Sequence, residues 1–414
     1  MALAATLTPA AVNVRILLAV AVVLLAARLF GWLISLIGQP QVHGEILAGI
    51  ALGPSLLGVV WPGAVDYLFP SEIVGALKIV AQLGLVVFMF LIGLELDLPK
   101  LSGQGHKAVL ISHASILLPI LLGVSLGFWL HPRFGEGADR LGFVLFLGVA
   151  MAITAFPVLA RVLQETGLYK TRVGVLTMTC AAVDDITAWC VLAGVVAIVK
   201  SAGFAETLTT IALSLAFVVA MLGLVRPLLA RLPAVPVWGA LALALGCAWT
   251  TEEIGIHAIF GAFLAGAVMP RGEGIQHEVK LKLETVTLSL LLPVFFVVVG
   301  LATRIDMLDS PYLWGVTAAV VAAAIVGKWG GSAIAARITG EPWRDANVIG
   351  ILMNTRGLTE LVILTVGLEL GVIGETMFTI MVLMALVTTL MATPMLALVS
   401  PAHRHRRGAL VPAA

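Results

Sequence analysis

Long apolar runs separated by short polar breaks fill almost the whole chain. A helix needs ~20 mostly apolar residues to cross the hydrocarbon of a bilayer, so each run of that length is a candidate span. The pattern predicts an all-α polytopic membrane domain over 15–400, with a short N-terminal segment, 1–14, and a short basic tail, 401–414. Cuts at charge clusters and at Pro or Gly breaks give about thirteen transmembrane helices, at 15–37, 43–61, 76–94, 108–130, 141–163, 173–199, 207–225, 235–250, 254–270, 283–302, 312–336, 346–368 and 376–400.

Composition places the chain in the same class. Of its 414 residues, 60% are hydrophobic and 11% are charged, and the mean hydropathy is +1.10. Soluble domains have roughly a quarter of their residues charged, so the lipid bilayer is the expected surrounding of this chain. The 24 basic and 23 acidic residues leave a net charge of +1, which provides no basic field for a nucleic-acid partner.

The distribution of basic residues predicts how the chain crosses the membrane. Fifteen of the 24 Lys and Arg residues fall on the side that includes the C-terminus, and six fall on the other side. Lys and Arg in short loops gather on the cytoplasmic side, so the N-terminus is expected outside and the C-terminus in the cytoplasm. We expect a multi-pass protein of the cell (plasma or inner) membrane, with the basic residues 403–407 as a cytoplasmic anchor.

Short sequence echoes predict an inverted repeat. Gly93 in the third predicted span corresponds to Gly300 in the tenth, and Gly49 in the second corresponds to Gly266 in the ninth. A polar break is also shared by the fifth and twelfth spans. The members of each pair lie seven spans apart, so the two copies cross the membrane in opposite directions, as in many secondary transporters.

Two of the predicted spans contain helix-breaking sequences. Pro157 cannot donate a backbone hydrogen bond and disfavours helix at the residue before it, so an interruption is expected from Thr154 to Pro157. The sequence MNTRGLTEL at 353–361 places Asn354 and Thr355 at mid-membrane in the corresponding span. A broken helix leaves carbonyls and half-helix dipole ends that can coordinate a small cation, so the two breaks indicate the binding site.

Asp184 and Asp185 lie at the centre of the otherwise uncharged span 173–199. Each charge at that depth costs at least ~2.5 kcal/mol, which favours a functional role for the pair. Adjacent helical positions point in directions about 100° apart, so different roles are expected. Desolvation and a neighbouring like charge both favour the protonated form of a carboxylic acid, and such a group can exchange a proton for a cation.

Three further charges are predicted at mid-membrane. Lys328 lies too deep in span 312–336 to reach the cytoplasm comfortably, and we expect it to pair with Asp184. Arg356 and Glu360 are four residues apart and form a pair, mainly structural, if the helix resumes at the break. The histidines have no metal-ligand spacing such as HExxH, and no resident cofactor is expected.

Six motifs together resemble the Kef-like monovalent cation:proton antiporter-2 family over about residues 15–400: HGEILAGIALGPSLLG, FLIGLELDL, AITAFPVLARVL, AAVDDITAW, GIHAIFGAFLAG and NTRGLTELVIL. The resemblance implies an NhaA-like inverted-repeat fold with two crossed discontinuous helices, in a homodimer that works by an elevator-like movement. It implies a core around 108–199 and 312–400, and a dimerisation or scaffold part around 15–94 and 207–302.

The resemblance also implies roles for individual residues. Asp185 resembles the family's cation- and proton-binding aspartate, Lys328 the basic partner, and Thr154 part of the coordinating break. Asp184 departs from the pattern, since this position often holds Asn or Gln in relatives and holds Asp in some sodium/proton exchangers. Unlike Kef proteins, the chain ends at Ala414 with no nucleotide-binding regulatory domain, so regulation of that kind within the chain is not expected.

These observations predict a secondary active antiporter that exchanges Na⁺ or K⁺ for protons, the cation binding at Asp185 and Asp184. Cation and proton compete for the mid-membrane aspartates, with alternating access. The alternative is a sodium-coupled organic-solute symporter of related inverted-repeat fold, which Lys328 opposite the aspartates disfavours. An intramembrane aspartyl protease is excluded because its two aspartates come from different helices, and no enzymatic activity is expected.

Overall fold

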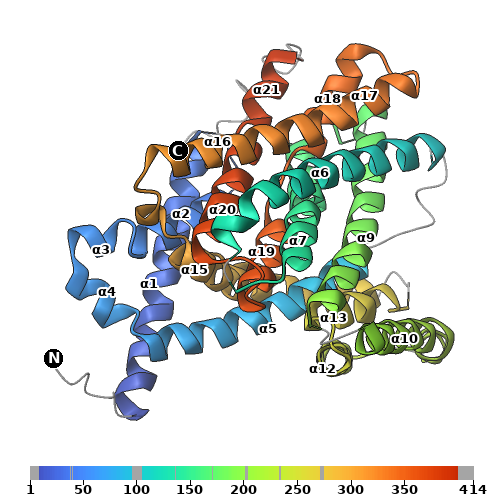
Figure 1. Ribbon diagram of the computed structural model, residues 1–414. Helices are drawn as coiled ribbons and strands as arrows, with labels where there is room; N and C mark the ends of the chain where they lie inside the picture. The colour runs from blue at the N-terminus through green and yellow to red at the C-terminus, as the bar shows by residue number, and fades with distance from the viewer. Residues whose placement is uncertain are drawn as a thin grey trace, which may run out of the picture. The chain divides into compact units, whose positions relative to one another are not determined.

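The computed structural model of the chain is helical throughout the part that it describes (Figure 1). The described residues are 9–37, 39, 41–95, 105–135, 137–169, 171–200, 204–232, 235–270 and 275–399, and they include no β-strand. Lipid offers no partners for backbone polar groups, and a helix satisfies them within its own segment. The prediction of an all-helical protein is therefore confirmed for these residues.

The chain divides into two compact units. Unit 1 comprises Met1–Ile37, Gln41–Leu96 and Thr209–Met307. Its helices, with α10 crossing the boundary at its start, are α1 (Pro9–Leu36), α2 (Gln41–Leu52), α3 (Leu57–Val60), α4 (Pro62–Leu68), α5 (Ser71–Glu95), α10 (Phe204–Ala220), the π-helix η2 (Met221–Val225), α11 (Arg226–Ala230), α12 (Val237–Ile254), α13 (Ala258–Ala267), α14 (Ile275–Val286), the π-helix η3 (Thr287–Leu291), α15 (Leu292–Ala302) and the 3₁₀ helix η4 (Ile305–Met307).

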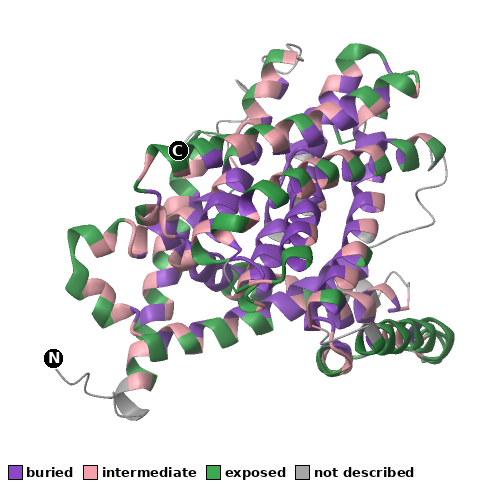
Figure 2. Ribbon diagram, viewed as in Figure 1, coloured by how far each residue is buried: buried purple, intermediate pink, exposed green. Residues whose placement is uncertain are grey.

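Unit 2 comprises Gly38–Pro40, Asp97–Leu208 and Leu308–Ala414. Its helices are α6 (Gly105–Phe134), α7 (Arg140–Ala152), α8 (Phe156–Glu165), α9 (Arg172–Lys200), α16 (Pro311–Ile325), the π-helix η5 (Val326–Gly330), α17 (Gly331–Ile338), α18 (Trp343–Met353), α19 (Leu358–Glu369), α20 (Glu375–Leu390) and α21 (Ala392–Val399). Buried residues concentrate on α7, α19 and α20 (Figure 2).

Nine helical segments of the described residues are long and apolar enough to cross a membrane. Two shorter apolar helices, α7 and α13, accompany them. Several predicted boundaries differ from the structure. The first helix begins at Pro9 instead of residue 15, and α2 ends at Leu52, because Pro54 cannot continue it. The predicted tail at 401–414, with its basic residues 403–407, lies outside the described residues.

Glycines allow two very close helix contacts within unit 1. Gly49 of α2 lies against Gly300 of α15, and a Cβ at Gly49 would come 2.8 Å from the Gly300 Cα. Gly266 of α13 lies against the backbone of α5 at Gly93. Small residues let helix backbones approach in lipid, where dispersion contacts rather than water exclusion hold helices together. Both contacts therefore require glycine at these positions.

Gly49→Ala is expected to destabilise the protein by ~1–3 kcal/mol, because the added methyl group overlaps the α15 backbone. The matched control is Gly246→Ala in α12, where an added Cβ meets nothing within 4 Å. The control is expected to be neutral or slightly stabilising, since alanine is the better helix former. Thermal unfolding of the purified protein in detergent measures both. Equal unfolding temperatures for the two variants would contradict this account of the glycine contact.

An ion cluster joins three helix ends in unit 2. Glu341, in the turn between α17 and α18, is 1% exposed and accepts hydrogen bonds from Lys107 Nζ at 3.0 Å and from Arg172. Arg172 also reaches Asp345 at 3.3 Å. Burial raises the pKa of the Glu341 carboxyl, but the hydrogen bonds and charges of Arg172 and Lys107 outweigh burial and hold that pKa below its usual range. The cluster therefore fastens the start of α6 and of α9 to the α17–α18 turn.

The sign of this pKa change predicts the pH range over which Glu341 stabilises the fold. A carboxyl whose pKa is lower in the folded state than in the unfolded chain stabilises the fold above the unfolded value, near 4.5, and loses that contribution as the pH falls through the folded value. The difference in unfolding temperature between wild type and Glu341→Gln is thus expected to be full at neutral pH and to shrink below pH 4.5. The exposed Glu375→Gln is the control. A difference that stays constant between pH 7 and pH 3 would contradict the assignment.

Candidate functional site

The first helix interruption separates α7 from α8. The backbone leaves the helix at Ile153, with φ −82° and ψ 140°, and becomes helical again at Phe156. Pro157 is therefore the second residue of α8, and the break lies further toward the N-terminus than the predicted range of Thr154 to Pro157. The physical reason is that proline is tolerated in the first turn of a helix, where its missing N–H has no intrahelical partner.

The second interruption separates α18 from α19 and meets the first. Residues Asn354 to Gly357 connect the two half-helices. The Ala155 N–H donates to the Thr355 carbonyl at 3.1 Å, and the Thr154 hydroxyl donates to the Met353 carbonyl at 3.1 Å. Two segments about 200 residues apart in the sequence thus satisfy each other's backbone groups inside unit 2. All the predicted site residues of this unit lie at or near this junction.

Asp184, on α9, is held by four side chains. Lys328 Nζ lies 2.5 Å from its carboxylate, and the Thr154 hydroxyl donates to it at 2.6 Å. Ser112 and Ser115 of α6 donate to its two oxygens at 2.9 and 3.4 Å. All five side chains are fully buried. Burying a polar group is costly unless it is hydrogen-bonded, and here both carboxylate oxygens have donors.

Lys328 lies in the π-helical turn η5, which interrupts the run from α16 to α17. Besides Asp184, its ammonium group donates to the Ser115 carbonyl at 3.2 Å and to the Ala152 carbonyl. Gly327 packs against Pro119 of α6, where an added Cβ would lie 3.0 Å from the proline Cα. The ammonium group therefore bridges α6, the end of α7 and α9. π-turns of this kind often occur at functional sites.

Asp185 is 4% exposed and differs sharply from its neighbour. Among the described residues, no donor makes a hydrogen bond to its Oδ1 atom. Burying a polar atom without a partner costs roughly 1–3 kcal/mol, and more if the group is charged. The two adjacent aspartates thus have different surroundings: both oxygens of Asp184 have donors, while one oxygen of Asp185 has none among the described residues.

Arg356 and Glu360 form a second fully buried ion pair, with Arg356 Nη1 at 2.5 Å from the Glu360 carboxylate. Arg356 lies just before α19 begins, and its guanidinium group also donates to the carbonyls of Ala150 at 3.2 Å and Met151 at 2.6 Å. Its backbone N–H donates to the Thr389 hydroxyl at 2.8 Å. The pair thus fixes the second break against α7 and α20.

Together the two cations cover the C-terminal end of α7. The carbonyls of Ala150, Met151 and Ala152 are the last of this half-helix, and Arg356 and Lys328 bind all three. The C-terminal end of a helix carries a partial negative charge, which these cations neutralise. At the corresponding end of α18, the Met353 carbonyl shares the single hydroxyl proton of Thr154 with the Asp184 carboxylate. Asn354 Oδ1 has no partner among the described residues.

The charges of the site do not balance. The buried ionisable side chains at the junction are three carboxylates, Asp184, Asp185 and Glu360, and two cations, Lys328 and Arg356. With every group ionised, one negative charge remains. A buried charge without a partner of opposite sign is costly. One proton or one monovalent cation would neutralise the remaining negative charge.

Some groups of the site were not identified from the sequence. Ser112 and Ser115 on α6 and the carbonyls at the end of α7 contact its charged side chains. Thr389 on α20 binds the backbone of Arg356. The spacing of the two serines, three residues apart in an apolar span, is a signal for one polar helix face. Within the described residues, no group of three or more His, Cys, Asp or Glu side chains is arranged to hold a metal ion.

Residues 19–400 match the family model described as "Sodium/hydrogen exchanger, transmembrane". The chain is 41% identical to the Na⁺/H⁺ antiporter NhaS4 of Synechocystis over 402 residues, covering 94% of this chain and 98% of that one. It is 37% identical to cation/H⁺ antiporter 19 of Arabidopsis thaliana and 33% identical to K⁺/H⁺ antiporter 1 of Saccharomyces cerevisiae. The chain spans about half the length of these two larger relatives, 49% and 46% respectively.

Among solved structures, the fold is similar to that of the sodium proton antiporter MjNhaP1 of Methanocaldococcus jannaschii. The TM-score is 0.66 at 14% sequence identity, over 94% of this chain and 98% of that one. Identity this low supports the fold alone. Since the family model covers most of the sequence, and a relative of nearly equal length is 41% identical, this chain belongs to the sodium/hydrogen exchanger family of transmembrane proteins.

Proposed function

We propose that this protein is a secondary active antiporter that exchanges a monovalent cation, Na⁺ or K⁺, for protons across a cell membrane. The observation that carries the proposal is the buried Asp185 oxygen without a donor, in a cluster with one uncompensated negative charge. A proton on Asp185 removes that charge, and a cation beside it balances it. The two ligands therefore compete for one position, and this competition couples their fluxes.

The comparisons support this class of function. NhaS4 is named as a Na⁺/H⁺ antiporter and the yeast relative as a K⁺/H⁺ antiporter, so both cations occur among the relatives' names. The relatives are transporters rather than enzymes, and the symporter alternative gains no support from them. The six motifs favour the Kef-like monovalent cation:proton antiporter-2 branch within the family.

The two aspartates receive different roles in this proposal. Asp185 binds the proton or the cation, while Asp184 stays ionised and holds Lys328 at the end of α7. Thr154, Asn354 and Thr355 supply the polar surroundings at the breaks, and the unpartnered Asn354 Oδ1 is a candidate cation ligand. If only Asp185 changes its protonation state, one proton is exchanged for one cation. A two-proton, electrogenic cycle requires Lys328 to release its proton as Asp184 is freed.

The glycine contacts of unit 1 support the inverted repeat. The sequence equates Gly49 with Gly266 and Gly300 with Gly93. Gly49 contacts Gly300, and their equivalents in the other half, Gly266 and Gly93, contact each other as well. A twofold relation between the two halves produces such paired contacts.

The proposed number of membrane crossings rests on the helices of both units. If α12, α13 and the two interrupted helices α7–α8 and α18–α19 each cross the membrane beside the nine candidate spans, the count is thirteen, which supports the proposed NhaA-like fold with crossed discontinuous helices. The basic-residue distribution favours an external N-terminus and a cytoplasmic C-terminus.

We assign the ion-binding core to unit 2, which contains the whole site, and the scaffold and homodimer contacts to unit 1. The division of the chain supports this assignment, since every side chain that contacts Asp184 belongs to unit 2. An elevator-like movement of the core then alternates access to the site.

Asp185→Asn is expected to abolish exchange, because an amide cannot release a proton to admit a cation. The assay uses everted vesicles with a preset proton gradient, to which Na⁺, K⁺ or Li⁺ is added while the lumenal pH is followed. Wild type should release protons on cation addition. The matched control is Asp306→Asn, an exposed carboxylate of unit 1 that pairs with Arg304 and should leave transport intact. Full activity in Asp185→Asn, or no cation-dependent proton release in wild type, would overturn the proposal.

Arg356 and Glu360 are proposed as a structural pair, and a double-mutant cycle tests this. Arg356→Gln and Glu360→Gln are each expected to cost ~3–5 kcal/mol, because each leaves one buried charge uncompensated. The double variant should cost clearly less than the sum of the two. Thermal unfolding measures all three, with the exposed pair Arg304 and Asp306 as the control cycle, where ~0–1 kcal/mol is expected. Strict additivity for the buried pair would contradict the assignment.

A further inference from the structure

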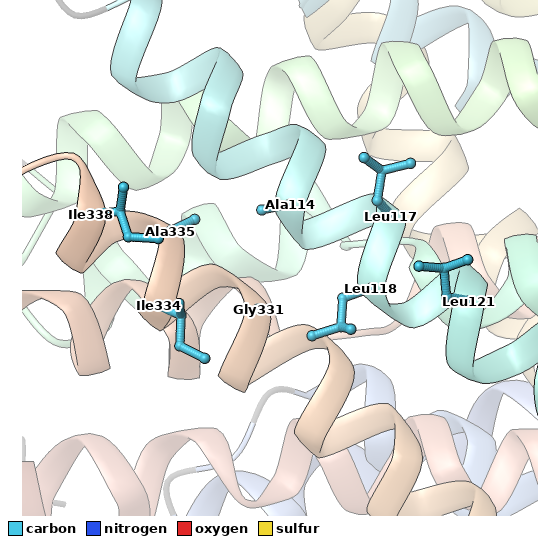
Figure 3. Close-up of a pocket in the computed structure, with 8 residues that line it drawn as sticks. All are labelled: Ala114, Leu117, Leu118, Leu121, Gly331, Ile334, Ala335 and Ile338. Carbon is cyan, nitrogen blue, oxygen red and sulfur yellow. The ribbon is translucent and has the colours of Figure 1, made fainter.

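A groove of about 280 Å³ runs between α6 and α17 on unit 2, and its lining is almost entirely apolar (Figure 3). Leu117 and Leu121 of α6 line one side, and Ile334 and Ile338 of α17 line the other. Gly331, which has no side chain, and Ala114, with a single methyl group, also line it and leave room between the helices. Both walls belong to candidate membrane spans.

The groove walls are strongly exposed. Leu121 is 61% exposed, Ile334 53% and Ile338 79%. In a membrane such side chains are covered by acyl chains or by another protein. A narrow channel between two helices with walls of leucine and isoleucine fits an extended hydrocarbon chain, because each methylene group can then contact both walls.

Basic side chains lie at the Ile338 end of this groove. Arg337 precedes Ile338 and donates to the Glu341 carbonyl at 3.3 Å, and Lys107 and Arg172 bind the Glu341 carboxylate. The Glu341 side chain is 1% exposed, whereas those of Lys107 and Arg172 are 40% and 52% exposed. These three cations face two carboxylates, Glu341 and Asp345. Asp345 is 30% exposed, which is less than either Lys107 or Arg172.

We propose that the groove binds one acyl chain of an anionic phospholipid, whose phosphate lies against Arg337 and Lys107. The shape and apolar lining select the hydrocarbon chain, and the positive end selects an anionic headgroup over a zwitterionic one. This site goes beyond ion exchange and does not depend on it, since the wall and the basic end share no side chain with the Asp184–Asp185 site.

The test compares phosphatidylglycerol with phosphatidylcholine of the same acyl chains, added to the whole protein in detergent. Bound lipid is counted by native mass spectrometry, and thermal unfolding is followed in parallel. Wild type should retain phosphatidylglycerol and be stabilised by it more than by phosphatidylcholine. Ala114→Leu with Ala335→Leu fills the groove and should lose the bound lipid. Ala318→Leu with Ala322→Leu on α16, exposed and outside the groove, is the matched control and should keep it.

A second variant leaves the groove unchanged. Arg337→Gln, on the surface, should weaken phosphatidylglycerol binding about fivefold and phosphatidylcholine binding by less, since both lipids carry the phosphate but only phosphatidylglycerol has a net negative charge. The Arg337→Gln variant tests the lipid proposal even if the variant with the filled groove does not fold. Equal lipid retention in filled and control variants, or no headgroup preference in wild type, would overturn the proposal. Loss of a dimer instead of a lipid in the filled variant would assign the groove to a second copy of the chain.

Discussion

The interrupted C-terminal end of α7, buried inside unit 2, is the constraint on which the site depends. An interrupted helix inside a membrane leaves carbonyls that neither lipid nor the helix itself can satisfy. Here Lys328 and Arg356 bind the last three carbonyls of α7, and each brings a carboxylate partner, Asp184 or Glu360. Replacing either cation would therefore leave both a helix end and a buried carboxylate without a partner. The first break, the π-turn η5 and α9 thus depend on one another.

This arrangement also isolates Asp185. With two carboxylates committed to two cations, its charge is the only one of the five buried groups without a partner of opposite sign. In the proposed exchange, one proton or one cation changes the charge of this single carboxyl, while the two surrounding ion pairs stay in place. Binding and release then require little rearrangement of the pairs that hold the breaks together.

Part of the candidate site could be predicted from the sequence. Depth in an apolar span was enough to single out Asp184, Asp185 and Lys328, because charge in lipid is costly, and the structure brings Lys328 to Asp184. Pro157 indicated an interruption but not its position, since proline fits the first turn of the helix that follows. Ser112 could not be assigned, because tertiary packing determines which face of α6 meets Asp184. The breaks predicted free carbonyls, but not that Lys328 and Arg356 would bind them.

The glycine contacts of unit 1 have a consequence for the order in which the molecule is built. Gly49 and Gly93 lie in the first segment of that unit, and their partners Gly300 and Gly266 are synthesised only after the stretch of unit 2 from Asp97 to Leu208. During translation these contacts of α2 and α5 therefore cannot form until α15 and α13 have been synthesised. Assembly of unit 1 is thus a late event, and a nascent chain halted before α13 has no means of completing it.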